Sequence, residues 1–345
     1  MVTIKDISKI SGYSVTTVSK ALNNYPDIAE STKKTIKKIC LDVGYIPNAQ
    51  AQGLVSKKSY TIGIIFEETT GVGLQHPLFS KILEAFKNEV EKAGYDIMFL
   101  SKSNTNGNGG SYYEHSMRKQ VEAILVLCAE FNSEEMNELY AGSLPIVMID
   151  FMSEYACNVT SDNQFGIGQA VSYLANLKHK KIAHIHGALD TYIGGLRLGC
   201  FRNAMKANHL TIKEEYFANG ALYTKEAGFS AMNSLLKLNI PPTAVVCASD
   251  MLAIGAIQAI KRKGLKVPRD ISIIGFDGID AGQLISPMLT TIRQDTVKMG
   301  TQAAKNILKM IKLKKRTKMG ETIQVETNIL EGETTKQYEK TNKTL

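Results

Sequence analysis

The sequence predicts an α/β protein with a small N-terminal helical domain and a larger core of two lobes built on parallel sheets. In the core, short runs that are apolar throughout alternate with helical patterns, which is typical of parallel strands covered on both faces. The alternation occurs as two successive series, which indicates two similar lobes. The first 60 of the 345 residues hold nine lysines against four acids, a net charge of +5 within a total of +8. A basic unit ahead of a nearly neutral body favours a polyanionic partner for that end.

Composition argues against several other classes of protein. No apolar run approaches the roughly 18 residues that a membrane-spanning helix needs. The N-terminus MVTIKDISKI lacks a basic region followed by an apolar block, which favours a cytoplasmic protein with no membrane partner. The five cysteines are widely and irregularly spaced without a CxxC pair, so no metal site is expected. Neither GxGxxG nor GxxxxGK(S/T) occurs, and we expect no cofactor and no enzymatic activity.

Residues 1–46 predict three short helices. The first begins after Thr3, which with Asp6 fits an N-cap followed by an acid in the first turn, and it ends at Gly12. The second begins after Ser14 and the third after Ser31, both good N-caps. Apolar residues at helical spacing are expected to pack between the helices. These are Ile4, Ile7 and Ile10 in the first helix, Val18 and Leu22 in the second, and Ile36, Ile39 and Val43 in the third.

Two helices joined by a short turn that contains glycine, with a third packed across them, are typical of a helix-turn-helix domain. The second helix of that motif enters the DNA major groove with its N-terminal residues against base edges. Those residues are Val15, Thr16 and Thr17 in this chain, with Lys20 one turn later. From the pattern alone, an ordinary three-helix bundle is the alternative.

Residues 47–59 predict a hinge helix and linker. The Ala/Gln-rich stretch is too short to form a stable helix alone, although Asn48 suits its N-cap. Leu54 is its one bulky apolar side chain. A plain linker is the alternative.

The core is predicted over 60–332. Its expected strands are 60–66, 95–100, 121–128, 145–150, 181–187, 243–249 and 271–277, and its expected helices are 78–94, 111–120, 164–178, 195–208, 250–263 and 296–313. The first lobe is expected at about 60–160 and 293–325, and the second at about 161–292. Ligands of such folds bind beyond the carboxyl ends of the strands. Residues 333–345 are expected to be a polar, solvent-exposed tail.

In order along the chain, the motifs TIKDISKISGYSVTTVSKALN, GYIPNAQAQGLVSKKS and VCASDMLAIGAIQAI…VPRDISIIGFDG…LTTIRQD resemble the lactose-repressor (LacI/GalR) family of bacterial transcription regulators. The resemblance covers roughly residues 2–332. It implies a helix-turn-helix domain with a hinge helix, then a two-lobed core similar to periplasmic sugar-binding proteins. It also implies a homodimer on a double-stranded DNA operator, controlled by a small-molecule effector between the lobes.

The resemblance implies a set of DNA contacts. They are Thr3, Ser14, Val15, Thr16, Thr17, Ser19, Lys20, Asn23, Asn48, Ala51 and Leu54. Val15 and Thr16 match positions that read bases. Lys20 stands where the family more often has Arg. Lys carries a mobile point charge, whereas Arg can donate two hydrogen bonds of fixed geometry to guanine. Leu54 matches a leucine that wedges into the minor groove, and Ala51 is small enough for two hinge helices to approach.

The resemblance also implies a set of effector contacts. They are Asp162, Arg197, Tyr223, Ser249, Asp250, Asp277 and Gln294. His76 is a further candidate, because the strand-to-helix loop of the first lobe that contains it would face the cleft. Arg197 matches an arginine that holds hydroxyls or a carboxylate, Asp277 an effector-binding acid, and Tyr223 an aromatic that stacks on the ligand. A structural ion pair between Arg197 and Asp277 is the alternative. Such a cleft fits a hydroxylated ring and fits a purine nearly as well.

We therefore predict a transcription regulator, a repressor, that binds a palindromic operator as a dimer under control of a sugar effector. The alternatives are a purine-responsive regulator and a catabolite-type regulator controlled by a protein partner. An enzyme would need a cofactor loop or an acid/base pair, and neither is recognisable. Whether the effector releases the DNA or promotes binding is left open.

Overall fold

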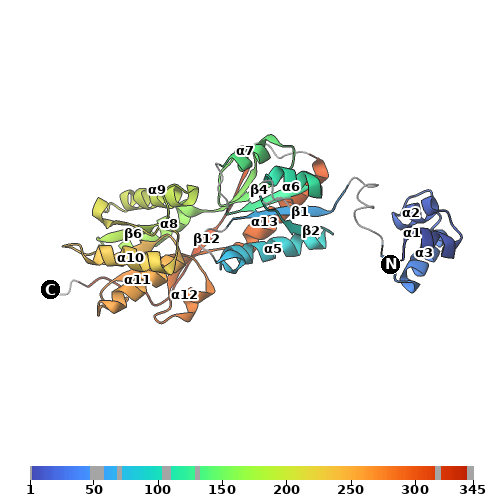
Figure 1. Ribbon diagram of the computed structural model, residues 1–345. Coiled ribbons are helices and arrows are strands. Elements are labelled where there is room, and N and C mark those ends of the chain that lie inside the picture. The colour runs from blue at the N-terminus through green and yellow to red at the C-terminus, as the bar shows by residue number, and fades with distance from the viewer. Residues whose placement is uncertain are drawn as a thin grey trace. The chain divides into compact units, whose positions relative to one another are not determined.

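The computed structural model describes residues 2–46, 58–67, 72–102, 110–128, 133–314 and 320–339 (Figure 1). The chain divides into two compact units. The first comprises Met1–Thr61 with Gln120–Glu122, and the second comprises Ile62–Lys119 with Ala123–Leu345. Within the described residues, no helix is both long enough and apolar enough to cross a membrane.

The N-terminal unit contains the helices α1 (Ile4–Ser11), α2 (Val15–Leu22) and α3 (Glu30–Asp42). The Asp6 carboxylate accepts hydrogen bonds from the Thr3 backbone N–H (2.9 Å) and hydroxyl (2.7 Å), which holds the start of α1. Gly12 ends that helix at φ 72°, a left-handed conformation that suits glycine. The small core contains Ile7, Val18, Ala21, Ile36 and Cys40.

Two expectations for this unit were wrong in detail. Ile10 is 57% exposed, because each three-residue step falls about 60° short of a full helical turn and carries it away from the buried stripe. The third helix begins at Glu30 after Ala29, so Ser31 lies inside the helix and does not cap it.

The first lobe is a sheet with the strand order β11-β5-β4-β3-β1-β2. Its strands are β1 (Thr61–Phe66), β2 (Asp96–Phe99), β3 (Ala123–Leu127), β4 (Ile146–Ile149), β5 (Cys157–Ser161) and β11 (Thr322–Val325). The pairs β1–β3, β3–β4, β4–β5 and β5–β11 are parallel. Helices α5 (Phe79–Lys92) and α13 (Thr296–Leu313) share one apolar cluster with this sheet. Helices α6 (Tyr112–Lys119) and α7 (Glu134–Ala141) lie over the opposite face (Figure 1).

The second lobe has the strand order β12-β10-β9-β8-β6-β7. Its strands are β6 (Ile182–His186), β7 (Phe217–Asn219), β8 (Ala244–Cys247), β9 (Ser272–Asp277), β10 (Thr290–Gln294) and β12 (Thr327–Leu330), and β12 runs antiparallel to β10. Helices α10 (Lys225–Leu236) and α11 (Asp250–Arg262) pack on one face, and α8 (Asn163–Asn176) and α9 (Tyr192–Ala207) on the other. A short helix, α12 (Asp280–Leu284), follows β9.

The α/β fold with parallel sheets is confirmed, and each strand and helix expected in the core is present within a few residues of its predicted bounds. Strands β5 and β10 were not predicted, because CNVTS and TTIRQ carry polar side chains that are typical of loops. Both strands are nonetheless buried, since their hydroxyls and amides bond to other parts of the core.

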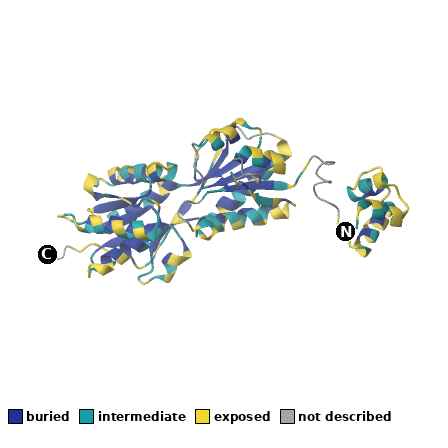
Figure 2. Cartoon of the chain, viewed as in Figure 1, coloured by how far each residue is buried: buried dark blue, intermediate teal, exposed yellow. Residues whose placement is uncertain are grey.

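The expected exposed tail was wrong for its first residues. Thr334 is fully buried; its hydroxyl donates to the Ile273 carbonyl, and its carbonyl accepts the Ile273 N–H at 2.8 Å. The Tyr338 N–H donates to the Leu177 carbonyl at 2.8 Å. Polar residues thus pack here because their backbone groups pair with the second lobe, whose strands are buried (Figure 2). Residues 340–345 lie outside the described part of the chain.

In the described part of the chain there are three passages between the lobes, which we name the first crossover (161–163), the second crossover (294–296) and the third crossover (325–327). β5 ends at the first crossover and β10 at the second. Because β5 lies parallel to β4 and β10 lies parallel to β9, the crossovers bring the carboxyl ends of both sheets to one region. This is where folds of this class bind ligands.

Candidate effector site and DNA-contacting helix

The exposed side of α2 carries the side chains predicted to read bases. Ser14, Val15 and Thr16 are exposed, and Val15 is 40% accessible despite being apolar. Val18 and Ala21 point into the core of the N-terminal unit. The Ser14 hydroxyl accepts the Thr17 backbone N–H at 3.1 Å, so Ser14 positions the first turn of the helix.

Other predicted DNA contacts already have partners within the chain. The Lys20 ammonium lies 2.6 Å from the Asp27 carboxylate, which raises the pKa of Lys20. The Asn23 side-chain amide donates to the Ser19 carbonyl at 2.9 Å and secures the end of α2. Thr3 is engaged by Asp6. Asp27 therefore competes with DNA for the Lys20 ammonium. Asn48, Ala51 and Leu54 lie outside the described residues.

In the core, Arg197 of α9 is the centre of a buried polar cluster. Its Nε donates to Asn163 Oδ1 at 2.8 Å and one terminal nitrogen donates to the Ala248 carbonyl at 2.6 Å. The guanidinium lies 3.9 Å from the centroid of the Phe276 ring. Only 3% of the residue is exposed. These contacts fix the plane of the guanidinium, so its charge is presented in one direction.

Asp277, the last residue of β9, lies beside this arginine. One carboxylate oxygen is 3.7 Å from the guanidinium and accepts a 2.7 Å hydrogen bond from the Gln294 amide. Burial raises the pKa of Asp277 to about 6, while Arg197 opposes the rise. Its φ of 121° is in the region that disfavours a side chain. Such strained backbone persists where the surrounding structure holds it, and it concentrates at functional sites.

A second acid, Asp150, completes the cluster and was missed by the sequence analysis. It directly follows β4 at φ 53° and accepts hydrogen bonds from the Thr160 hydroxyl and the Ser161 N–H. Burial raises its pKa, and the charge of Arg197 counteracts this. The signal was present, because PIVMID ends in an acid after an apolar strand just as ISIIGFD does.

For a ligand, the hydroxyl of Tyr223 rather than its ring face is the group available for contact. The ring lies against Gly187, where any Cβ would overlap it, and the residue has a φ of 60°. Its hydroxyl is buried, and no hydrogen bond of standard geometry reaches it from the described residues. A buried hydroxyl of this kind usually has a partner, which a bound ligand could provide.

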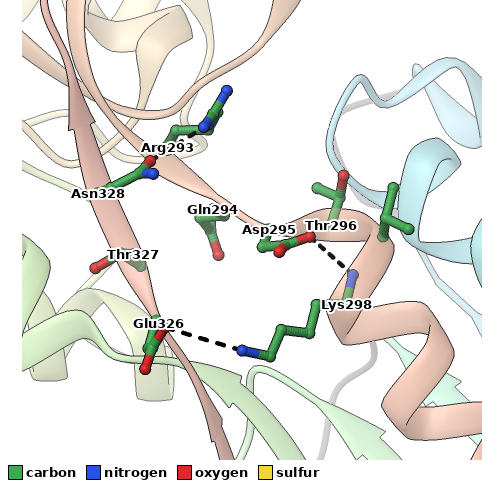
Figure 3. Close-up of a pocket in the computed structure, with 9 residues that line it drawn as sticks. Arg293, Gln294, Asp295, Thr296, Lys298, Glu326, Thr327 and Asn328 are labelled. Atoms are coloured by element: carbon green, nitrogen blue, oxygen red, sulfur yellow. Dashed lines mark hydrogen bonds and ion pairs between the residues drawn. The ribbon is translucent and has the colours of Figure 1, made fainter.

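Two pockets open at the crossovers. One of about 380 Å³ is lined by residues of β10, α13 and β12 (Figure 3); they are Arg293, Gln294, Asp295, Thr296, Val297, Lys298, Glu326, Thr327 and Asn328. The other, of about 290 Å³, includes Asp277 and Gln294 and lies between α5 and α12. At its rim, Lys81 of the first lobe forms a 2.7 Å ion pair with Asp280 of the second.

Comparisons with known proteins place the chain in a family. A family model described as bacterial regulatory proteins, lacI family, matches residues 3–48, and one for a periplasmic binding protein-like domain matches 171–335. The repressor PurR of Actinobacillus pleuropneumoniae serotype 3 (strain JL03) is 33% identical over 326 residues, which is 94% of this chain and 95% of the relative. The chain belongs to the LacI family.

Other relatives agree with this. The probable repressor ExuR of Bacillus subtilis (strain 168) is 35% identical over 314 residues, covering 90% of this chain and 92% of the relative. A lac repressor dimer bound to operator and the anti-inducer ONPF has the same fold, with a TM-score of 0.81 at 23% identity over 97% of this chain and 99% of that one. The protein is thus a LacI-family transcriptional repressor and not an enzyme.

In this LacI-family repressor, some predicted effector contacts have roles within the chain. The Asp250 carboxylate is fully buried and accepts the N–H groups of Gly278 and Ile279, both at 2.8 Å, and the Thr291 hydroxyl. Asp250 therefore shapes the loop after Asp277.

Further predicted contacts cap helices or pack locally. Ser249 accepts the Leu252 N–H at the start of α11, and Asp162 accepts the Phe165 N–H at the start of α8. His76 packs its ring 4.6 Å from that of Phe79. The structure thus brings Arg197, Asp277, Gln294 and Tyr223 together. The side chains of Asp250, Ser249 and Asp162 instead accept hydrogen bonds from backbone N–H groups.

Proposed function

We propose that this repressor binds a two-fold operator as a homodimer and that a neutral, hydroxylated small molecule, a sugar, controls it from the polar cluster around Arg197, beside the crossover pockets. The observation that carries the proposal is a pair of acids, the buried Asp150 and the largely buried Asp277, at the carboxyl ends of strands from different lobes, with one arginine near both. A ligand that contacts both acids would bridge the lobes.

The charge balance favours a neutral ligand with several hydroxyl donors. Carboxylates accept hydrogen bonds from hydroxyls, and the oriented guanidinium donates to hydroxyl oxygens. An anionic ligand would be attracted by Arg197 but would face two acids in a buried site, where like charges are costly. The buried Tyr223 hydroxyl, which has Thr191 beside it, adds one polar group that can bond to a sugar ring.

The proposed mechanism couples the cleft to the DNA through the angle between the lobes. A ligand that binds one arrangement more tightly shifts the equilibrium toward it, and operator affinity then changes by the same coupling free energy. A homodimer would place two copies of α2 one helical turn of DNA apart, which requires a palindromic operator. We place the protein in the cytoplasm, where the DNA is.

The test is an effector screen by fluorescence anisotropy on a selected operator duplex. Neutral hexoses, hexuronates and purine bases are titrated separately against the preformed complex. A change in operator affinity of about tenfold with a neutral sugar supports the proposal. A response only to purine bases supports the alternative that the sequence leaves open, and one only to hexuronates contradicts the charge argument.

A matched pair of variants tests the site itself. Arg197→Lys keeps the charge but loses the fork geometry, and it should abolish the response. Arg202→Lys, on the same helix, changes an exposed arginine that pairs with Glu214, and it should respond like the wild type. Equal responses from both variants would refute the assignment. Sedimentation at micromolar concentration tests the dimer.

A further inference from the structure

A chain of buried hydrogen bonds, closed into a ring by the 3.7 Å ion pair between Arg197 and Asp277, joins the polar cluster around Arg197 to the crossovers. Gln294 donates its amide N–H to Asp277 Oδ1 at 2.7 Å, and its amide oxygen accepts the Ser161 hydroxyl at 2.5 Å. On the other side of the ring, Arg197 donates to Asn163, whose amide donates to the Ser161 carbonyl at 2.9 Å. Ser161 belongs to the first crossover and Gln294 to the second, so the ring connects both to the effector site.

We propose that Gln294 is a positioning residue that transmits the state of Asp277 to the first crossover through Ser161, and so sets the angle between the lobes. The sequence analysis gave Gln294 the role of an effector contact. In the structure its oxygen and its nitrogen are both engaged by the chain, and only 3% of the residue is exposed. This inference rests on the proposed function, because it takes Asp277 as the residue that meets the effector.

Because of these contacts, a change at Asp277 must displace the side-chain amide of Gln294. Because only 3% of Gln294 is exposed, little water can replace a lost partner, so the amide moves with its acceptor or is left poorly satisfied. When an effector hydroxyl shares the carboxylate, or when Asp277 takes up a proton, the charge-assisted bond from Gln294 weakens. Because the same amide group holds Ser161, the change reaches the end of β5.

The relay also reaches the first lobe beyond the crossover. The Ser161 hydroxyl lies 3.3 Å from Met299 Sδ, and Met299 is a fully buried residue of α13, which packs with α5 in the first-lobe core. Figure 3 shows Gln294 on the segment that runs from β10 into α13. A displacement of Gln294 therefore also displaces the strand and the helix that connect the lobes.

A second route from Asp277 to the first crossover runs through Arg197 and Asn163. The distances from Asp277 to Arg197 and to Gln294 decide between the two routes. Arg197 lies 3.7 Å from Asp277, longer than a hydrogen bond, whereas Gln294 lies at 2.7 Å. Arg197 is also held by Ala248 and stacked on Phe276, so its position depends less on Asp277. We therefore expect the signal to pass through Gln294.

The test measures hydrogen exchange of the free protein in a double-mutant cycle. The reporter is the Asp162 amide, which donates to the Val325 carbonyl at 2.8 Å and joins the first crossover to the third. The perturbation is Asp277→Asn, which neutralises the acid at nearly constant shape. With Gln294 present, this change should speed exchange at the reporter by about fivefold, the effect of losing one ordinary hydrogen bond.

In a Gln294→Ala background the added effect of Asp277→Asn should vanish. If Gln294→Ala fails to fold, Ser161→Ala removes the other end of the relay and should give the same result. Thr160→Ala is the matched control, because it removes a neighbouring buried hydroxyl that bonds to Asp150 and not to Gln294, and the effect should persist there.

An effect of Asp277→Asn that is equal with and without Gln294 would overturn the proposal and point to the arginine route. No effect in either background would also overturn it. Neither DNA nor an effector is present in this experiment, so a failure here is distinct from failure of the proposed function, which the operator and effector measurements test.

Discussion

The role of Asp250 allows the sharpest quantitative prediction. Its carboxylate accepts the backbone N–H groups of Gly278 and Ile279, each at 2.8 Å, together with the Thr291 hydroxyl. Gly275 leaves room for this carboxylate, since a Cβ there would overlap it. Asp250→Ala would leave these buried donors without an acceptor, at about 1–3 kcal/mol for each unsatisfied group. We expect a loss of about 3 kcal/mol in the free energy of unfolding of the core.

A thermal denaturation series would measure this loss. At about 2–4 °C per kcal/mol for a unit of 150–250 residues, Asp250→Ala should lower Tm by about 6–12 °C. Asp250→Asn keeps one oxygen for both N–H groups and should cost only about 1 kcal/mol. Asp280→Ala is the control in the same region, because its ion pair with Lys81 is exposed and worth at most about 1 kcal/mol.

Either of two results would refute this stabilising role of Asp250. If Asp250→Ala denatures within about 2 °C of the wild type, the carboxylate does not hold the loop. Its role would then return to the effector contact that the sequence predicted. Equal losses in Asp250→Ala and Asp280→Ala would likewise contradict the reasoning.

Three further predictions concern binding. Sugar affinity should fall below about pH 6, because burial raises the pKa of Asp277 to about 6. Hydroxyl donors bind the ionised carboxylate better, and this form is lost as the pH falls. Calorimetry should show this fall for the wild type and a flat pH profile for Asp277→Asn. Thr16→Ala should reduce discrimination at one operator base by about tenfold without changing Tm, whereas Val18→Ala should melt the N-terminal unit, as circular dichroism would show. Asp27→Asn should release Lys20 and tighten binding to non-operator DNA, with a salt slope steeper by about one.

Much of the fold followed from hydrophobic patterning. The buried strands β3 and β8 are continuous apolar runs, and β1 and β9 are apolar over most of their length, a pattern typical of strands covered on both faces. β5 and β10 escaped prediction because their burial depends on polar partners from distant segments. Ser161, for example, bonds to a residue 133 positions away. Single-sequence patterns contain no information on such pairings.

The candidate site was predicted only in part for the same reason. Arg197 and Asp277 were found through the family resemblance, and the structure places them side by side. Asp150 joined them because β4 ends beside the first crossover, which depends on sheet order rather than on local sequence. Asp250 looked like a ligand residue in the sequence, and only the fold shows that its oxygens hold the loop after β9.

The central claim is that the exposed side of α2 reads a two-fold operator. Selection of the purified protein against random duplexes, at two salt concentrations and with sequencing of the bound pool, tests it most directly. We expect a palindromic consensus whose half-sites lie one helical turn apart and which persists at the higher salt. Binding without a consensus that disappears with salt would mean phosphate contact alone and would contradict it.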